Sequence, residues 1–154
     1  ERLIVADIAP VSYGTGAPLR PFVEAMQAVD PSARATRKEV DRDLSQHVSD
    51  TGIRQFLLSN LVRTDGGFRW TLNLDAIAAA LDDLAGWPAP DGPYEGPALF
   101  LAGGRSEYVP GSVDGVIRRL FPRAELRRVP AGHWIHAEAP QATLAELRRF
   151  LELG

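Results

Sequence analysis

The chain has 154 residues, of which 45% are hydrophobic and 24% are charged, and its formal net charge at pH 7 is −3. This balance indicates a globular chain of about one domain and excludes an intrinsically disordered one. A negative charge without a long basic run argues against nucleic acid as a partner. Because the chain has no cysteine, disulfides, thiolate nucleophiles and zinc–thiolate sites within it are excluded.

No apolar run reaches the roughly 18 residues that a membrane-spanning helix needs, so no membrane span is expected. Residues 1–5 also lack the charged-then-apolar order of a signal peptide. If the natural N-terminus is retained, these two observations predict a soluble, cytoplasmic protein.

A continuous apolar run at residues 3–8 is typical of a strand buried on both faces of a parallel sheet. Such a strand needs neighbours and covering helices, so we expect a chain that opens with it to be the second half of a larger fold. Asp7 closes the strand, at a place where a carboxylate ordinarily accepts hydrogen bonds from turn N–H groups. The later Gly14-Thr15-Gly16 triplet is not followed directly by a helix start, so it does not predict a phosphate-binding loop.

The middle of the chain is predicted to be mostly helical. Thr36 and Glu39 form the capping-box pattern that opens a helix, and residues 68–72 alternate as a short extended piece. The apolar spacing predicts helices over 21–29, 36–47, 53–62 and 74–84. An inserted helical segment of this kind is typical of a cap that excludes water from an active site.

We therefore divide the chain into a core, residues 1–18 and 88–154, and a helical cap, residues 19–87. Four large side chains of the cap are candidates for lining a substrate pocket, although side chains at helical spacing more often belong to a hydrophobic core. They are Phe22, Met26, Phe56 and Trp70.

After the insertion, the pattern returns to alternating strands and helices. Residues 98–102 form a second apolar run, and Ser112 is the expected cap of a helix that ends near Leu120. Residues 125–129 are a less apolar strand, expected nearer the sheet edge, and residues 140–151 form the last amphipathic helix. Three strands with intervening helices predict an α/β fold whose sheet is incomplete.

A Pro130-Ala131-Gly132 turn after the third strand presents His133 just before a helix. That places an imidazole at the carboxyl edge of the sheet, where open α/β folds put their chemistry. A histidine in this position can act as a general base near neutral pH. The alternative interpretation is a loop histidine that only hydrogen-bonds backbone groups.

Several segments together resemble a subfamily of α/β-hydrolase serine esterases, and the resemblance covers the whole chain. They are residues 7–10, 55–58 with 60–61, 68–70 with 72–74, 100–101 with 103–104, 121–124 and 132–138. The resemblance implies the C-terminal part of an α/β-hydrolase parallel sheet with an inserted helical cap. It further implies hydrolysis of a small-molecule carboxylic ester or acyl thioester, with no cofactor and no metal.

The family's triad runs Ser, acid, His along the chain, with the serine on a Gly-x-Ser-x-Gly elbow. The resemblance makes His133 the general base and adds its neighbour Trp134 to the substrate-binding candidates. Where many relatives carry the acid, this chain has Ser106 followed by Glu107. We therefore expect Asp7 to hold the Nδ1–H of His133, with Asp75 as the second candidate for the acid and Glu107 as the third. Asp75 also has an ordinary role in the first turn of its predicted helix, where a carboxylate meets the helix dipole favourably.

No serine of this chain lies on such an elbow. The nucleophile and the oxyanion-hole donors are therefore expected upstream, in a missing N-terminal half without which this chain would be inactive. Two alternatives stay open. One is a haloalkane dehalogenase-like hydrolase with Asp on the elbow, and the other is a non-catalytic module of the same fold that binds an apolar ligand or a partner.

Overall fold

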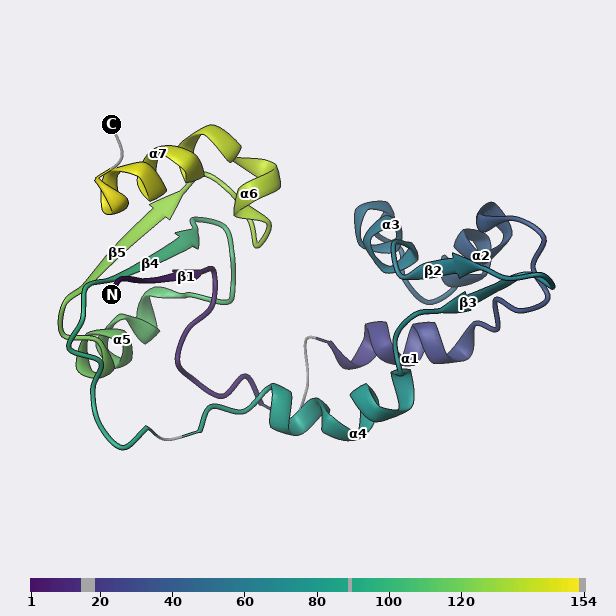
Figure 1. Ribbon diagram of the computed structural model, residues 1–154, viewed down its shortest axis with the longest axis horizontal. Helices are drawn as coiled ribbons and strands as arrows, with labels where there is room; N and C mark the ends of the chain where they lie inside the picture. Colours follow the sequence, from purple (N-terminus) through teal and green to yellow (C-terminus); the bar gives the residue numbers. More distant parts are fainter. Residues whose placement is uncertain (15–18, 89, 153–154) are drawn as a thin grey trace. The chain divides into compact units, whose positions relative to one another are not determined.

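The computed structural model describes residues 1–14, 19–88 and 90–152 (Figure 1). Its contacts divide the chain into two compact units, a sheet unit of Glu1–Val11 with Pro88–Gly154 and an inserted unit of Ser12–Trp87. The sequence analysis placed the first boundary after residue 18, which lies outside the described residues, and residues 12–14 group with the inserted unit. That the inserted unit acts as a cap stays a prediction.

The sheet unit is built on three parallel strands. They are β1 (Leu3–Ala6), β4 (Ala98–Gly103) and β5 (Ala124–Val129), in the order β1-β4-β5 (Figure 1). Every residue of the central strand β4 is buried, and β5 lies at an edge as predicted. Both faces of β1 are covered, since Leu3 and Val5 pack against the apolar cluster on one face of the sheet and Ile4 packs against the cluster on the other. Residues 3–5 are half-buried and not fully buried.

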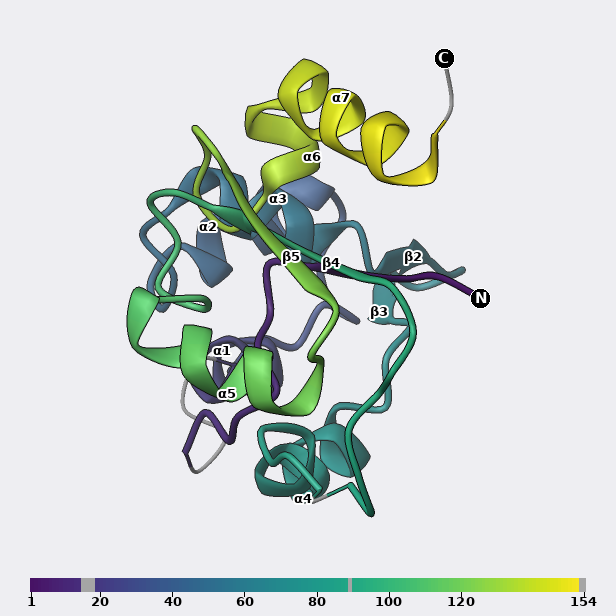
Figure 2. The same cartoon turned by 90° about the vertical axis from the view of Figure 1, so that its left-hand side faces the viewer.

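Helices cover both faces of this sheet, α5 (Asp114–Leu120) on one and α7 (Pro140–Leu151) on the other (Figure 2). Successive side chains of a strand point to opposite faces, so β4 supplies both cores. Phe100 packs in the same cluster as Ile117 of α5, whereas Leu101 packs in the cluster of Phe150 of α7. The predicted parallel α/β architecture is therefore confirmed, with the loops that leave β4 and β5 at one edge of the sheet.

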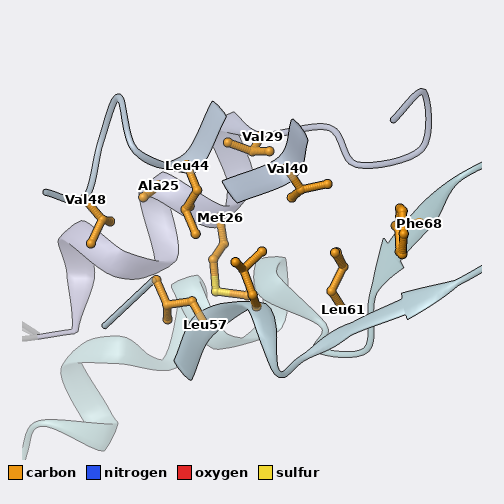
Figure 3. Close-up of a cluster of buried hydrophobic side chains, with 10 residues drawn as sticks. Ala25, Met26, Val29, Val40, Leu44, Val48, Leu57, Leu61 and Phe68 are labelled. Carbon is orange, nitrogen blue, oxygen red and sulfur yellow. The ribbon is translucent and has the colours of Figure 1, made fainter. Parts of the chain in front are cut away.

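The inserted unit combines four helices with a two-stranded hairpin among its described residues. The helices are α1 (Arg20–Ala28), α2 (Arg37–Leu44), α3 (Thr51–Leu58) and α4 (Leu74–Leu84), and the strands are β2 (Leu61–Arg63) and β3 (Phe68–Trp70). The predicted capping box is present, since the Thr36 hydroxyl accepts from the Glu39 N–H while the Glu39 carboxylate accepts from the Thr36 N–H. Figure 3 shows the unit's own apolar core, in which Met26 lies among leucines and valines from α2 and α3.

Two predicted elements are wrong in detail. The helix expected over 53–62 ends at Leu58, and Leu61 instead pairs antiparallel with Trp70 in the hairpin. A short apolar run does not distinguish helix from strand by its period, and the pairing partner decides. Ser112 does not cap α5, because it lies inside a 3₁₀ turn (Gly111–Val113) and α5 begins at Asp114 without a side-chain cap.

Two short elements complete the sheet unit. They are the 3₁₀ turn just named and α6 (Ile135–Glu138), which follows the predicted histidine turn. In the part of the chain that the structure describes, no helix has both the length and the apolarity needed to cross a bilayer.

Candidate functional site

Asp7 ends β1 with its side chain buried inside the sheet unit. Its φ of 48° is left-handed, a conformation that aspartate tolerates better than most residues. Its N–H still donates to the Leu101 carbonyl at 2.8 Å, which ties it to the central strand. The residue therefore ends the extended run of β1 and begins the loop at the carboxyl edge of the sheet.

The Asp7 carboxylate accepts hydrogen bonds from three residues in two segments of the chain. Its Oδ1 accepts from the Gly103 N–H at 2.7 Å, and its Oδ2 accepts from the Ser106 hydroxyl at 2.5 Å. The same Oδ2 lies 2.7 Å from Nδ1 of His133. Only 1% of the Asp7 side chain is exposed. Burial of a carboxylate is unfavourable unless its oxygens are hydrogen-bonded, and these three donors meet that need.

His133 is held at one ring nitrogen while much of the side chain remains accessible. Its side chain is 44% exposed, and its ring stacks on Tyr108 with the two centroids 4.2 Å apart and the planes 28° from parallel. When Nδ1 carries the proton that Asp7 accepts, Nε2 has a free lone pair. The arrangement can therefore take up a proton at Nε2 and stabilise the imidazolium that results.

The turn that carries His133 lies against the exit of β4. The Gly104 N–H donates to the Val129 carbonyl at 2.8 Å, and the Arg105 N–H donates to the Ala131 carbonyl at 2.9 Å. A Cβ at Gly103 would lie 2.0 Å from the Gly132 carbonyl oxygen, far inside van der Waals contact. Only glycine at position 103 permits this approach, which brings the Ser106 segment and the His133 turn to the same carboxylate.

A second carboxylate, Glu138 of α6, holds the same turn from its other end. It accepts from the Gly132 N–H at 2.8 Å and from the Arg105 guanidinium at 2.9 Å, and that guanidinium also donates to the Pro130 carbonyl. The Gly132 N–H has the largest effect and lowers the pKa of Glu138 below the ordinary range of a glutamate. Burial opposes it to a smaller extent, and the Trp134 N–H and Arg105 lower the pKa further. The charged form of Glu138 is thus the form that fastens the turn.

The other two candidate acids have different surroundings. Asp75 is in α4 of the inserted unit, where it accepts from the Gln27 side chain at 2.8 Å. Glu107 is an exposed neighbour of Ser106. The structure therefore brings Asp7 to His133, and Ser106, at the position where an acid was expected, donates to Asp7 instead.

The five predicted substrate-binding side chains have mixed environments. Trp134 is half-buried next to His133. Phe22, Met26 and Trp70 contribute to the core of the inserted unit, whereas Phe56 is 57% exposed. Met26 and Trp70 also border an open hollow of about 490 Å³ within that unit. Their contact with a substrate stays a prediction.

Sequence reasoning missed the contacts of Gly103, Ser106 and Tyr108 with this site. Ser106 was noted only as the residue that replaces an acid, and the available signal was the close spacing of these three residues after a buried strand. The ranges that the structure describes contain no cluster of three or more His, Asp or Glu side chains suited to a metal ion.

The chain is similar to proteins that are named as lipases and esterases, although no family model matches it. The chain is 47% identical to mouse "sn-1-specific diacylglycerol lipase ABHD11", over 98% of this chain and 51% of the mouse protein. It is 36% identical to "Esterase YbfF" of Escherichia coli, over 98% of this chain and 58% of that protein. A solved "Marine microorganism esterase" superposes with a TM-score of 0.91 at 36% identity, over 97% of this chain and 60% of that one. The chain thus spans about half the length of the curated relatives it matches.

Replacement of Gly103 by alanine tests the close approach of the two loops. We expect Gly103→Ala to lower the free energy of unfolding by about 2 kcal/mol or more, because its Cβ meets backbone that cannot move aside cheaply. Gly115→Ala in α5 is the control, since no atom lies within 4 Å of its added Cβ and alanine favours a helix. Chemical denaturation of both variants checks this, and equal effects would contradict the close approach.

The acid dependence of stability tests the role of Glu138. Because the pKa of Glu138 is lowered in the folded protein, its ionised carboxylate stabilises the fold at pH values above the ordinary pKa of a glutamate. This stabilisation is lost as the pH falls through the lowered pKa. Glu138→Gln should therefore have a lower urea midpoint than the parent at about pH 7, and the gap should narrow at about pH 3. A gap that is the same at both pH values would show that the charge of Glu138 does not fasten the turn.

Proposed function

We propose that this chain, which has the fold of the C-terminal part of an α/β-hydrolase, supplies the histidine and the acid of a hydrolase that acts on carboxylic esters. His133 is the general base and Asp7 is the acid that orients it. The single observation that carries this proposal is the 2.7 Å contact between Nδ1 of His133 and the buried carboxylate of Asp7. The naming of relatives as lipases and esterases supports ester hydrolysis as the reaction.

The proposed mechanism follows from the two nitrogens of the imidazole. Asp7 keeps the proton on Nδ1, so the lone pair of Nε2 accepts the proton of an attacking serine hydroxyl. The serine oxygen then bonds to the ester carbonyl carbon, and Nε2 returns the proton to the leaving alcohol. Water attacks the resulting acyl-enzyme with the same help from His133, which releases the acid and restores the serine.

Ser106 and Gly103 hold the Asp7 carboxylate in place beside His133. Both donate to the Asp7 carboxylate, in addition to the contact with Nδ1 of His133. A carboxylate fixed in this way stabilises the imidazolium during the reaction by its charge and not by taking the proton.

The nucleophile is proposed to lie in polypeptide that precedes Glu1. The chain contains no Gly-x-Ser-x-Gly elbow, and the relatives that it matches along nearly all of its length are about twice as long. The oxyanion-hole donors belong to the same preceding polypeptide. On this proposal the chain alone does not hydrolyse esters, and the longer protein does.

The inserted unit is proposed to act as the cap over the substrate. Of the candidate side chains, the exposed Phe56 and the half-buried Trp134 would present apolar surface to the acyl group, whereas Met26 is 2% exposed and supports the core of the inserted unit with Phe22 and Trp70. The substrate class that fits is a small-molecule acyl ester or acyl thioester, which needs an apolar pocket and few polar contacts.

Substitution of His133 and of Asp7 in the longer protein, followed by measurement of ester hydrolysis, tests the proposal. We expect His133→Ala to lower kcat/KM for a simple acyl ester by roughly 10³-fold or more, and Asp7→Asn to have an effect of similar order, because each removes part of one unit. A fluorophosphonate probe should label the parent protein at a serine upstream of this chain.

The controls are residues of the same type outside the site. His136→Ala removes an exposed histidine three positions along the chain, and Asp75→Asn removes the second candidate for the acid; both should keep the parent activity. Full activity in His133→Ala would contradict the assignment of the base. Full activity in Asp7→Asn together with loss of activity in Asp75→Asn would assign the role of the acid to Asp75. No labelling and no hydrolysis by the parent would favour a non-catalytic binding module.

A further inference from the structure

Tyr108 makes a ring contact with His133 that the proposed reaction does not yet use. The two ring centroids are 4.2 Å apart and the planes are 28° from parallel, which is a stacked arrangement. Among the described residues, the His133 side chain is 44% exposed, and the Tyr108 ring packs on its face. A single hydrogen bond at Nδ1 also tolerates tilting of the ring, because N–H···O bonds have a broad angular range. A stacked neighbour restricts that tilt.

Tyr108 is itself fixed by the same network. Its backbone N–H donates to the Ser106 hydroxyl oxygen at 3.2 Å, and that hydroxyl donates to Asp7. Asp7 in turn holds Nδ1 of His133, whose ring stacks on Tyr108. The four residues form a closed circuit in which one hydrogen bond fixes the direction of the imidazole and one ring contact fixes its plane.

The Tyr108 ring is also anchored away from the imidazole. It is half-buried and packs against the apolar cluster that contains Phe100 and Ile117. The surface that His133 meets is therefore part of the packed sheet unit. An aromatic face also attracts a cation, so the stack becomes more favourable when Nε2 takes up a proton.

We propose that Tyr108 is a positioning residue that holds the imidazole plane of His133 so that Nε2 is directed at the nucleophile. This inference rests on the proposed function, because it assigns Tyr108 a part in that reaction. The aromatic ring of Tyr108, which makes the contact with His133, carries the effect.

The first test measures the stacking of Tyr108 on His133 by NMR and does not depend on enzyme activity. In the longer protein, the ring current of Tyr108 should shift the His133 ring protons upfield in the NMR spectrum, with the signals assigned by their loss in His133→Ala. Tyr108→Leu should abolish that shift and Tyr108→Phe should retain it. Unchanged His133 signals in Tyr108→Leu would show that the rings do not stack and would overturn the inference, even if the protein proves to be an esterase.

The second test separates positioning from substrate binding. Tyr108→Leu should lower kcat by about tenfold with KM little changed, because orientation of the base matters in the chemical step. Tyr108→Phe should restore kcat to within about twofold of the parent. Tyr94→Leu is the control for loss of an aromatic ring from the same apolar cluster, since the Tyr94 ring packs with Phe121 at 6.1 Å, and it should leave kcat unchanged.

Each outcome of this test is decisive for Tyr108. An unchanged kcat in Tyr108→Leu, or a loss in Tyr108→Phe as large as that in Tyr108→Leu, would overturn the role of the ring. If the parent protein hydrolyses no ester, the proposed function fails, and the NMR test alone still decides whether the ring orients His133.

Discussion

The buried carboxylate of Asp7 is the constraint on which the rest of the sheet unit depends. A charge that is 1% exposed is stable only when hydrogen-bond donors replace the water it has lost. Those donors are Gly103 and Ser106 from the exit of β4 and His133 from the turn after β5. The parallel strand order β1-β4-β5 brings the carboxyl ends of the three strands together at Asp7.

The inserted unit interrupts the sequence of the sheet unit without interrupting its strand pairing. β1 pairs directly with β4, from Leu3 opposite Ala98 to Ala6 opposite Leu101, although the whole inserted unit lies between them in sequence. The inserted unit has a core of its own, so its folding does not depend on completion of the sheet core. Such an organisation lets the insertion vary in shape while Asp7 and His133 keep their geometry, which suits the proposed role of a cap in setting substrate preference.

Local sequence was enough to locate most of the helices and strands but not the contacts at the site. Apolar runs located the strands at residues 3–6 and 98–103, and the Thr36 capping box located a helix start. The hairpin at Leu61 was missed, because its partner Trp70 decides the conformation of a run that also suits a helix. His133 was picked out by its place after a strand and turn, whereas its partner came from the family resemblance. Asp7 and His133 are 126 positions apart, and no periodicity in a sequence reports a pairing at that distance. The bond from Ser106 to Asp7 and the stack of Tyr108 on His133 were missed for the same reason.

The central claim is that Asp7 fixes the proton of His133 on Nδ1 and leaves Nε2 as the acceptor. The ¹⁵N chemical shifts of the His133 ring, measured in the longer protein under conditions where the imidazole is neutral, test this most directly. The account predicts that Nδ1 has the shift of a protonated nitrogen and Nε2 that of an unprotonated one. A proton on Nε2, or the averaged shifts of a freely exchanging imidazole, would contradict it.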